Sequence, residues 1–343
     1  TPPKSATSSV NSGEKPTIVA SYSVLCYFTE RIVQDTAQVE CPIAPGNDPH
    51  SYTPKPSDRQ AMETAQLILY GGYQFDTSVA TLIQATKTTA PKVAVNEEAV
   101  PQPLMGDHHH HGEEAGEAGE KHEEKHEEEQ GKEHESVAGE TQTKSNDEHD
   151  EHDEHEKGEK EADPHVWHSA KNAIAMVSVI GDRLIALNPS QTELYTKNAA
   201  QLTQELQQLD RWIAAQIATI PESSRTLITT HDALGYYVSA YGLNALESLQ
   251  GLSSDESPTP ARVAELVELI RQTNVPTIFA EVTANDRAIT TVAREANIKL
   301  SDEKLIVDGL GDRDSDTGTY TGMMKHNTCA IVNGLGGTCK PKE

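Results

Sequence analysis

The chain has 343 residues, which is enough for two ordinary domains with a buried core in each, and its formal net charge is -26. This acidic balance excludes a basic footprint for nucleic acid, and no apolar run approaches the roughly 20 residues that span a bilayer. We therefore expect a water-soluble protein with no nucleic-acid partner and no transmembrane segment.

Residues 1–14 form a flexible leader rich in Ser, Thr and Pro, without the apolar core of a signal peptide, so we interpret the sequence as a mature form. The apolar, β-branched runs that follow predict four short strands, at 16–23, 37–43, 66–72 and 92–96. Before the third run, Ser57 with Gln60 three residues later indicates a capping box at the start of a helix. Alternating strands and helices predict a parallel sheet.

A segment of different composition, residues 97–163, follows the fourth run. It has no aromatic residue, and residues 107–163 hold 23 Asp and Glu against 6 Lys and no Arg. Such a segment cannot bury enough apolar surface to offset the entropy of ordering, so we expect a long, mobile, disordered insertion.

The insertion contains H-E-x-x-H at residues 122–126, the pattern of zinc metalloproteases. No apolar residue between Gly119 and Glu135 could anchor such a helix on a core, so we attribute the pattern to composition. Loose imidazoles beside many carboxylates still bind divalent metals weakly, which predicts an auxiliary metal-collecting loop. Its ten histidines are His108, His109, His110, His111, His122, His126, His134, His149, His152 and His155.

The rest of the chain resumes a regular pattern. Residues 169–220 show helical periodicity broken once at Asn188-Pro189, and the part after the break predicts a rigid connecting helix about 40 Å long. Strand-like runs return at 226–230, 244–249, 276–282 and 304–310, between helices expected at 233–241, 260–272, 286–296 and 317–333.

These patterns predict the α/β class with two lobes, each containing a mostly parallel four-stranded sheet flanked by helices. The expected boundaries are a leader at 1–14, a first lobe at 15–188, a connecting helix at 189–219 and a second lobe at 220–343. Of the four cysteines, Cys329 and Cys339 enclose a short glycine-rich loop, so we expect them to form a disulfide. Four buried thiols in a reducing compartment are the alternative, and the pairing of Cys26 and Cys41 stays open.

Three of the five histidines outside the insertion fall at strand-to-helix junctions. His50 lies in a proline-rich loop, His165 follows the insertion, and His231 directly follows a strand. Open α/β sheets bind ligands at the carboxyl ends of their strands, so two facing lobes can bring these imidazoles together. Taken singly, each could be an ordinary surface histidine. Their shared location favours a ligand site.

Two carboxylates, Asp308 and Glu281, are expected at strand ends on the same edge and are candidates for a fourth ligand. Either could instead cap the helix that follows. His168, three residues after His165, could support the site, but we expect it to lie at the surface.

The segments PHSYTPKPSD, DPHVW, HDALGYY and the region from IVDGLG to TYTGMMKHN, in this order, resemble the metal-binding solute receptors of bacterial ABC importers. The chain looks like their periplasmic zinc-uptake (ZnuA) type, which has a His- and acid-rich insertion. The resemblance extends from about Lys15 to the C-terminus. It implies two α/β lobes joined by one long helix, with the metal held between them.

The resemblance implies His50 and His165 as ligands from the first lobe and His231 and Asp308 as ligands from the second, with water as an alternative to Asp308. Manganese-type relatives usually have Glu at the position of His231. Three imidazoles suit Zn²⁺, whereas a set richer in oxygen suits Mn²⁺. The resemblance therefore implies a zinc protein.

We accordingly expect a periplasmic monomer that captures Zn²⁺ and delivers it to a membrane ABC permease, with no covalent chemistry. Its affinity should collapse as the pH falls through about 6.5, because imidazoles bind metal only when neutral. A zinc hydrolase with Glu281 as base is one alternative, since three histidines and a water are also a catalytic pattern. A storage or buffering protein, whose insertion holds most of the metal, is another.

Overall fold

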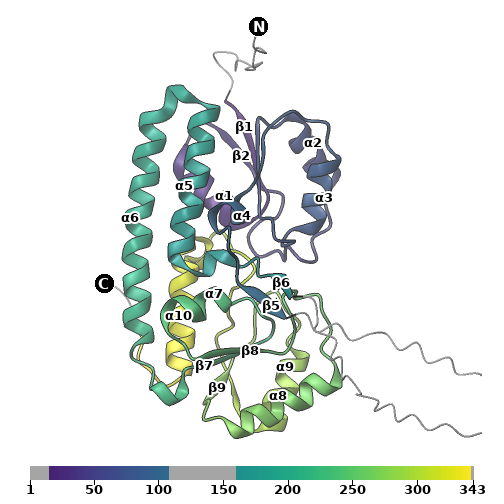
Figure 1. Cartoon of the computed structure of the whole chain (residues 1–343), viewed down its shortest axis with the longest axis vertical. Coiled ribbons are helices and arrows are strands. Elements are labelled where there is room, and N and C mark those ends of the chain that lie inside the picture. The colour runs from purple at the N-terminus through teal and green to yellow at the C-terminus, as the bar shows by residue number, and fades with distance from the viewer. Residues whose placement is uncertain (1–14, 108–159, 341–343) are drawn as a thin grey trace, which may run out of the picture. The chain divides into compact units, whose positions relative to one another are not determined.

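The computed structural model describes residues 15–107 and 160–340, which form two α/β lobes (Figure 1). The first lobe contains a sheet of four parallel strands in the order β2-β1-β3-β4. All four lie within runs that the sequence predicted as strands, and their parallel pairing is confirmed. Their bounds are Thr17–Ala20 (β1), Gln38–Glu40 (β2), Leu67–Tyr70 (β3) and Lys92–Ala94 (β4).

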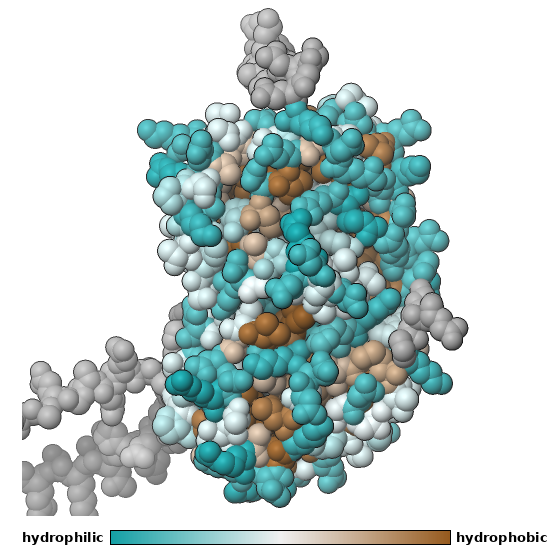
Figure 2. Space-filling view, turned by 180° about the vertical axis from the view of Figure 1, so that it is seen from behind, coloured by the Kyte–Doolittle hydropathy of each residue, from teal (hydrophilic) through white to brown (hydrophobic). Residues whose placement is uncertain are grey.

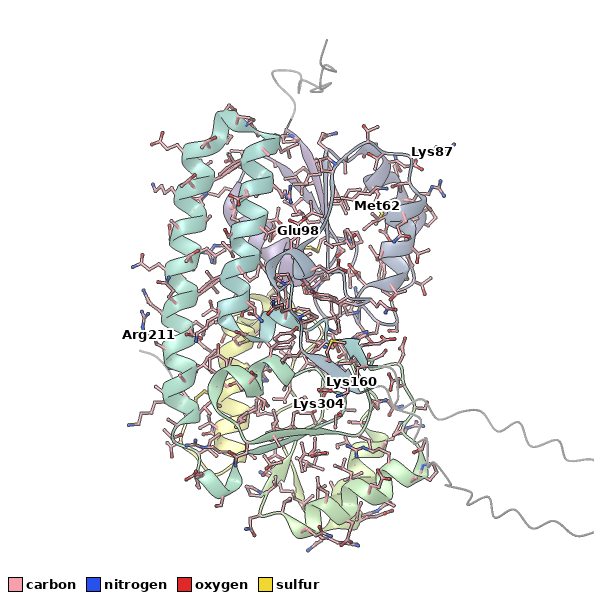
Figure 3. All side chains as sticks on the ribbon, in the orientation of Figure 1. Met62, Lys87, Glu98, Lys160, Arg211 and Lys304 are labelled. Atoms are coloured by element: carbon pink, nitrogen blue, oxygen red, sulfur yellow. A yellow bond between two sulfur atoms is a disulfide. The ribbon has the colours of Figure 1, made fainter. Side chains whose placement is uncertain are left out.

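Helices flank this sheet and supply its core. Met62 of α2, labelled in Figure 3, points toward the sheet and is fully buried. The helices described before residue 100 are α1 (Ser23–Val33), α2 (Pro56–Thr64), α3 (Thr77–Ala85) and α4 (Val95–Ala99).

The predicted start of α2 was wrong by two residues. The N-cap is Lys55, not Ser57, and the Asp58 carboxylate accepts the backbone N–H of Lys55 at 2.7 Å. Pro56 occupies the first helical position, where a missing N–H removes no helical hydrogen bond. The acidic residue that reaches back to the cap is therefore Asp58, and Gln60 has no part in it.

An antiparallel pair of strands, β5 (Met105–Asp107) and β6 (Lys160–Ala162), stands where the insertion leaves and rejoins the lobe. Together with α4, it corrects the prediction that residues 97–163 are disordered throughout. Backbone contacts order these ends, since Asp163 N–H donates to the Leu104 carbonyl at 2.8 Å and Leu104 N–H donates to the Tyr236 hydroxyl at 3.0 Å. The ten histidines of the insertion and its H-E-x-x-H sequence lie at 108–159, outside the described residues.

Two long helices follow, α5 (Ala170–Leu187) and α6 (Thr192–Ile217), separated by a short 3-10 turn at the predicted break. The 26 residues of α6 span about 39 Å, as predicted. In Figure 1, α6 runs along the side of both lobes, packed against α1 and α5 of the first lobe and α10 of the second. The described residues contain the 3-10 turns η1 (Val166–His168), η2 (Pro189–Gln191), η3 (Glu222–Ser224) and η4 (Asp316–Gly318).

The second lobe contains two parallel strand pairs, β7 with β8 and β9 with β10. A hydrogen bond of 2.9 Å from Phe279 N–H to the Ile228 carbonyl joins the two pairs. Its strands are β7 (Thr226–Thr229), β8 (Ala245–Ser248), β9 (Thr277–Ile278) and β10 (Lys299–Leu300), and its helices are α7 (Gly235–Tyr241), α8 (Pro260–Gln272), α9 (Arg287–Ala296) and α10 (Tyr320–Gly334).

The strand predicted at 304–310 is absent from the described residues, where β10 takes its place at Lys299–Leu300. Only Leu305 makes a bridge, with Glu281, and the chain then leaves the sheet. The reason is the side chain of Asn327, which accepts the N–H of Ile306 at 2.9 Å and donates to its carbonyl at 2.7 Å. Both polar groups of Ile306 are thus satisfied without a neighbouring strand.

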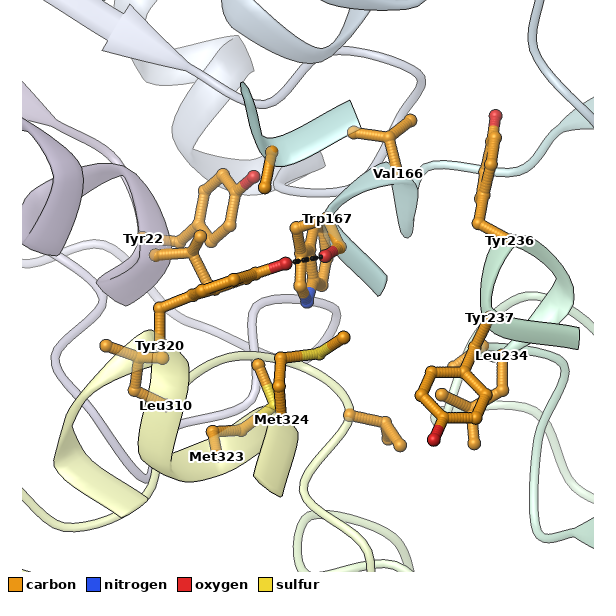
Figure 4. Close-up of a cluster of buried hydrophobic side chains, with 14 of the residues drawn as sticks. Tyr22, Val166, Trp167, Leu234, Tyr236, Tyr237, Leu310, Tyr320, Met323 and Met324 are labelled. Atoms are coloured by element: carbon orange, nitrogen blue, oxygen red, sulfur yellow. Dashed lines mark hydrogen bonds between the residues drawn. The ribbon is translucent and has the colours of Figure 1, made fainter. Parts of the chain in front are cut away.

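An aromatic core lies between the lobes (Figure 4). The ring of Trp167 packs on Tyr22 and Phe75 of the first lobe, with centroid distances of 5.2 and 4.7 Å. The hydroxyl of Tyr320, on α10 of the second lobe, donates to the Trp167 carbonyl at 2.6 Å. All four side chains are fully buried, so this core fixes the lobes next to the segment that carries His165.

Two disulfides are present. The predicted pair, Cys329 with Cys339, is found, and Cys26 pairs with Cys41. The alternative of four buried thiols was therefore wrong, because no cysteine is free.

The surface is mixed in character. On the face shown in Figure 2, hydrophobic residues form separate patches among hydrophilic ones. Within residues 15–107 and 160–340, no helix combines the length and apolar character needed to cross a membrane.

Candidate metal centre

Four side chains from distant parts of the sequence meet between the lobes: His50, His165, His231 and Asp308. One ligand atom of each lies within 4.8 Å of the others. Asp308 Oδ1 is 3.2 Å from His231 Nε2, 3.5 Å from His50 Nε2 and 3.6 Å from His165 Nε2. The Nε2 atoms of His50 and His165 are 3.3 Å apart. A tetrahedral site with metal–ligand bonds of about 2.0 to 2.1 Å has edges of about 3.3 to 3.4 Å, close to these four distances.

Two of these atoms lack hydrogen-bond partners. His231 Nε2 and Asp308 Oδ1 are both buried without a partner, although they are only 3.2 Å apart. Buried polar groups are almost always paired, so an unpaired acceptor facing an unpaired nitrogen requires an explanation. A cation bound between them would supply it.

The two first-lobe histidines share one local motif, Asp-Pro-His. In each copy, the carboxylate of the Asp (Asp48 or Asp163) accepts the backbone N–H of the His (His50 or His165) at 2.9 Å. Such a turn closes on its own side chain, and the proline between them fixes φ. The sequence thereby sets the direction of both imidazoles without a helix or strand.

The copies differ in how the ring is held. Asp163 Oδ1 also accepts from Nδ1 of His165 at 2.9 Å, which leaves Nε2 of the neutral ring unprotonated and facing the centre. The Asn96 side-chain amide donates to the carbonyl of Pro164 at 3.0 Å and helps to fix the segment that carries His165. His50 instead packs its ring edge-on against Phe75, and its side chain is the most exposed of the four, at 6%.

His231 lies two residues after the end of β7 and is oriented by Glu281, which lies three residues after the end of β9. Glu281 Oε1 accepts the backbone N–H groups of Thr230 and His231, each at 3.1 Å, while Oε2 accepts a short hydrogen bond from His231 Nδ1. This bond directs Nε2 of His231 to the centre. Glu281, named from the sequence as a possible fourth ligand or base, therefore lies at the Nδ1 side of the His231 ring, while Nε2 faces the centre.

Asp308 occupies an irregular segment held by side chains from elsewhere. His168 Nε2 donates to the carbonyl of Val307 at 2.8 Å, and Leu310 N–H donates to the hydroxyl of Ser23 at 2.9 Å. Fixed on both sides, Asp308 presents Oδ1 to the three imidazoles. Asp308 lies beside the three imidazoles, whereas the strand expected at 304–310 is not formed among the described residues.

In the metal-free cluster, the surroundings favour positively charged imidazoles at His165 and His231 and a negatively charged carboxylate at Asp308. Burial lowers the pKa of His231, but the charges of Glu281 and Asp308 outweigh it and raise that pKa well above its usual value. Burial also opposes protonation of His165, yet its hydrogen bond to Asp163 and the nearby carboxylate of Asp308 leave its pKa raised. Burial would raise the pKa of Asp308, but the imidazoles, His231 foremost, hold it well below its usual range. The centre therefore attracts positive charge.

His168 corrects a prediction, because it is fully buried and not at the surface. Burial, followed by the nearby charge of His165, lowers its pKa to about 3, so it is neutral and donates through Nε2. The signal in the sequence was its spacing. Residues three apart in a 3-10 turn lie on one face, and His165 precedes a turn of which His168 is the last residue.

Comparison with known proteins identifies the family of this chain. The model of a family described as zinc-uptake complex component A, periplasmic (ZnuA), matches residues 18–334. The chain belongs to the ZnuA family. This membership confirms the resemblance found in the sequence.

The chain is similar to proteins with more than one named metal. The manganese-binding lipoprotein MntA of Halalkalibacterium halodurans is 28% identical, over 94% of this chain and 89% of the relative. The manganese ABC transporter substrate-binding lipoprotein PsaA of Streptococcus anginosus is 26% identical, over 94% and 90%. Among solved structures, the periplasmic zinc binding protein TroA of Treponema pallidum has a TM-score of 0.74 at 26% identity, over 94% and 99% of the two chains. The proteins to which this ZnuA-family chain is similar are thus named for zinc in one case and for manganese in two.

Proposed function

We infer that the protein is the extracytoplasmic substrate-binding component of a metal ABC importer and that its cargo is Zn²⁺. His50, His165 and His231 would bind the ion through Nε2, and Asp308 through Oδ1. The ion would then pass to a membrane permease. The observation that carries this proposal is the convergence of four possible ligand atoms, three of them on buried residues, among which His231 Nε2 and Asp308 Oδ1 lack a hydrogen-bond partner.

The donor set supports zinc over manganese. Three imidazole nitrogens and one carboxylate oxygen form a common four-coordinate zinc set, whereas Mn²⁺ prefers oxygen ligands and octahedral geometry. The manganese names of the relatives describe those proteins. For this chain, the choice of zinc rests on the donor atoms of its own four candidate ligands.

A competition titration tests this choice of metal. We expect one tight Zn²⁺ per chain, held at least about 100-fold more tightly than Mn²⁺. His231→Ala should weaken zinc binding by a factor of 100 or more, and His326→Ala, a histidine outside the centre, should leave it unchanged. Tighter binding of Mn²⁺ than of Zn²⁺ by the wild-type protein would refute the zinc assignment.

The hydrolase alternative is disfavoured by Glu281. A catalytic zinc needs an open coordination position and a nearby general base. Glu281 uses both carboxylate oxygens on His231 and the backbone of Thr230, and Asp308 occupies the place where a water would bind. Zinc-dependent ester or peptide hydrolysis that disappears in His231→Ala would revive the alternative.

The insertion would serve as an auxiliary weak collector or sensor, and the fold allows a clean test of this role. Asp107 and Lys160 are paired across the β5–β6 ladder, so an Asn-Gly turn can replace residues 108–159. We expect this variant to keep the tight zinc ion and to lose the weaker ones in native mass spectrometry. Loss of the tight ion would show that the insertion holds it, as a storage protein requires.

The proposed compartment is supported by the two disulfides, which persist in oxidising surroundings such as the periplasm. The named relatives PsaA and MntA are lipoproteins, and PsaA is named for an ABC transporter. A permease partner follows from this kinship. We propose that the chain acts as a monomer beside it.

A further inference from the structure

The two oxygens of the Asp308 carboxylate have different surroundings. Oδ1 faces the three imidazoles at 3.2 to 3.6 Å. Oδ2 accepts a short hydrogen bond from the hydroxyl of Thr283. Only one oxygen is therefore directed at the centre.

Thr283 is fixed in this position by its neighbours in the loop after β9. Val282 N–H donates to the Leu305 carbonyl at 2.9 Å, and Glu281 forms a bridge with Leu305. These contacts hold the loop beside the segment that carries Asp308. The backbone that carries Thr283 is consequently held in place next to the Asp308 carboxylate.

We propose that Thr283 is a positioning residue that determines metal selectivity by keeping Asp308 monodentate. This inference rests on the proposed function. With Oδ2 held by Thr283, Asp308 contributes one ligand atom and the centre has four. Rotation of the carboxylate to bring in Oδ2 would raise the coordination number to five and break the hydrogen bond to Thr283.

The direction of selectivity follows from coordination chemistry. Zn²⁺ is satisfied by four ligands, whereas Mn²⁺ gains from additional oxygen ligands and higher coordination numbers. The Thr283 hydrogen bond therefore opposes the arrangement that Mn²⁺ prefers and leaves the zinc arrangement intact. A hydrogen bond to a charged group corresponds to about a 10- to 100-fold change in an equilibrium constant.

Thr283→Val tests the proposal, because it removes the hydroxyl with little change of shape, and Thr283→Ser is the matched control that keeps it. Affinities for Zn²⁺ and Mn²⁺ are measured by competition with a chromophoric chelator. We expect Thr283→Val to reduce the preference for Zn²⁺ over Mn²⁺ by about 10- to 100-fold relative to the wild type. Thr283→Ser should retain the wild-type preference.

Cobalt supplies a readout that a purely structural role would not change. Four-coordinate Co²⁺ absorbs visible light much more strongly than five- or six-coordinate Co²⁺, so Thr283→Val should weaken the band and Thr283→Ser should preserve it. Thr283→Ala, which also lacks the hydroxyl, takes the place of Thr283→Val if the latter does not fold. An unchanged metal preference, within threefold, together with an unchanged cobalt spectrum would overturn the proposal.

This outcome is distinguishable from failure of the proposed function. The proposed function fails if the wild-type protein does not prefer Zn²⁺. The inference about Thr283 is judged on the difference between variant and wild type, which can be measured whichever metal the wild type prefers.

Discussion

Replacing Glu281 with Gln changes one atom of the side chain and should separate the orientation of His231 from its presence. Glu281 accepts three hydrogen bonds, two from backbone N–H groups at 3.1 Å and one from His231 Nδ1. A glutamine has one carbonyl oxygen and one NH₂ group at the same positions. It therefore cannot keep all three.

Each orientation of the new amide has a distinct consequence. If its oxygen accepts the two backbone groups, its NH₂ donates to Nδ1 of His231 and moves the ring proton to Nε2, where the metal should bind. If its oxygen accepts from Nδ1, the NH₂ faces two buried N–H donors. The first orientation weakens metal binding, and the second lowers the free energy of unfolding by about 1 to 3 kcal/mol per unpaired group.

We expect Glu281→Gln to weaken zinc binding by about 10- to 100-fold, the usual effect of losing a carboxylate behind a metal-binding histidine, which corresponds to about 1.4 to 2.8 kcal/mol. A chelator competition at pH 7.5 measures the change. Glu63→Gln is the matched control, since Glu63 is an exposed partner of Arg59 and does not belong to the centre. Zinc affinity within threefold of wild type in Glu281→Gln would refute the argument that Glu281 orients His231.

Three further outcomes follow from the structure. The raised pKa values of His165 and His231 stabilise the metal-free fold below the unfolded pKa of about 6.5, and this stabilisation is lost as the pH rises through the raised values. Without metal, the melting temperature should therefore fall above pH 6.5, while the increase in melting temperature on adding Zn²⁺ should grow. An increase that becomes smaller over this pH range would contradict the prediction. His168→Leu should lower the free energy of unfolding by about 1 to 3 kcal/mol in urea titrations, because the carbonyl that His168 bonds becomes unpaired, and an unchanged midpoint would show that the bond adds nothing. Serine at both Cys26 and Cys41, which are 15 residues apart, should lower it by about 3 kcal/mol, measured against the same protein with the disulfide intact, and a loss under 1 kcal/mol would argue against stabilisation through loop closure.

Local patterns predicted the strands of the first lobe and the three histidines, because both depend on short-range signals. Apolar runs between Pro, Gly and Asn marked the strands, and the strand ends marked where His50 and His231 would lie. The fourth strand of the second lobe was wrong because its decisive contact, Asn327 with Ile306, joins residues 21 apart through a side chain. No periodicity records such a contact.

The groups around the ligands were mostly beyond prediction for the same reason. Glu281 was named from its strand end as a candidate ligand or base, but its bond to His231 was not predicted, since that bond spans 50 residues. Thr283 was not predicted at all, because a single threonine has no distinctive pattern. Asp163 is the exception. Its place in Asp-Pro-His, repeated around His50, was visible in the sequence and could have identified it as the partner of His165.

The four candidate ligands divide equally between the lobes, with two imidazoles from one and an imidazole and a carboxylate from the other. A hinge movement of a few ångströms would therefore halve the coordination sphere in one step, and neither half alone would hold the ion firmly. Under the proposed function, such a movement would tie the occupancy of the site to the conformation of the protein. A transporter that senses only the outer contour of this protein could distinguish a loaded carrier from an empty one without touching the metal.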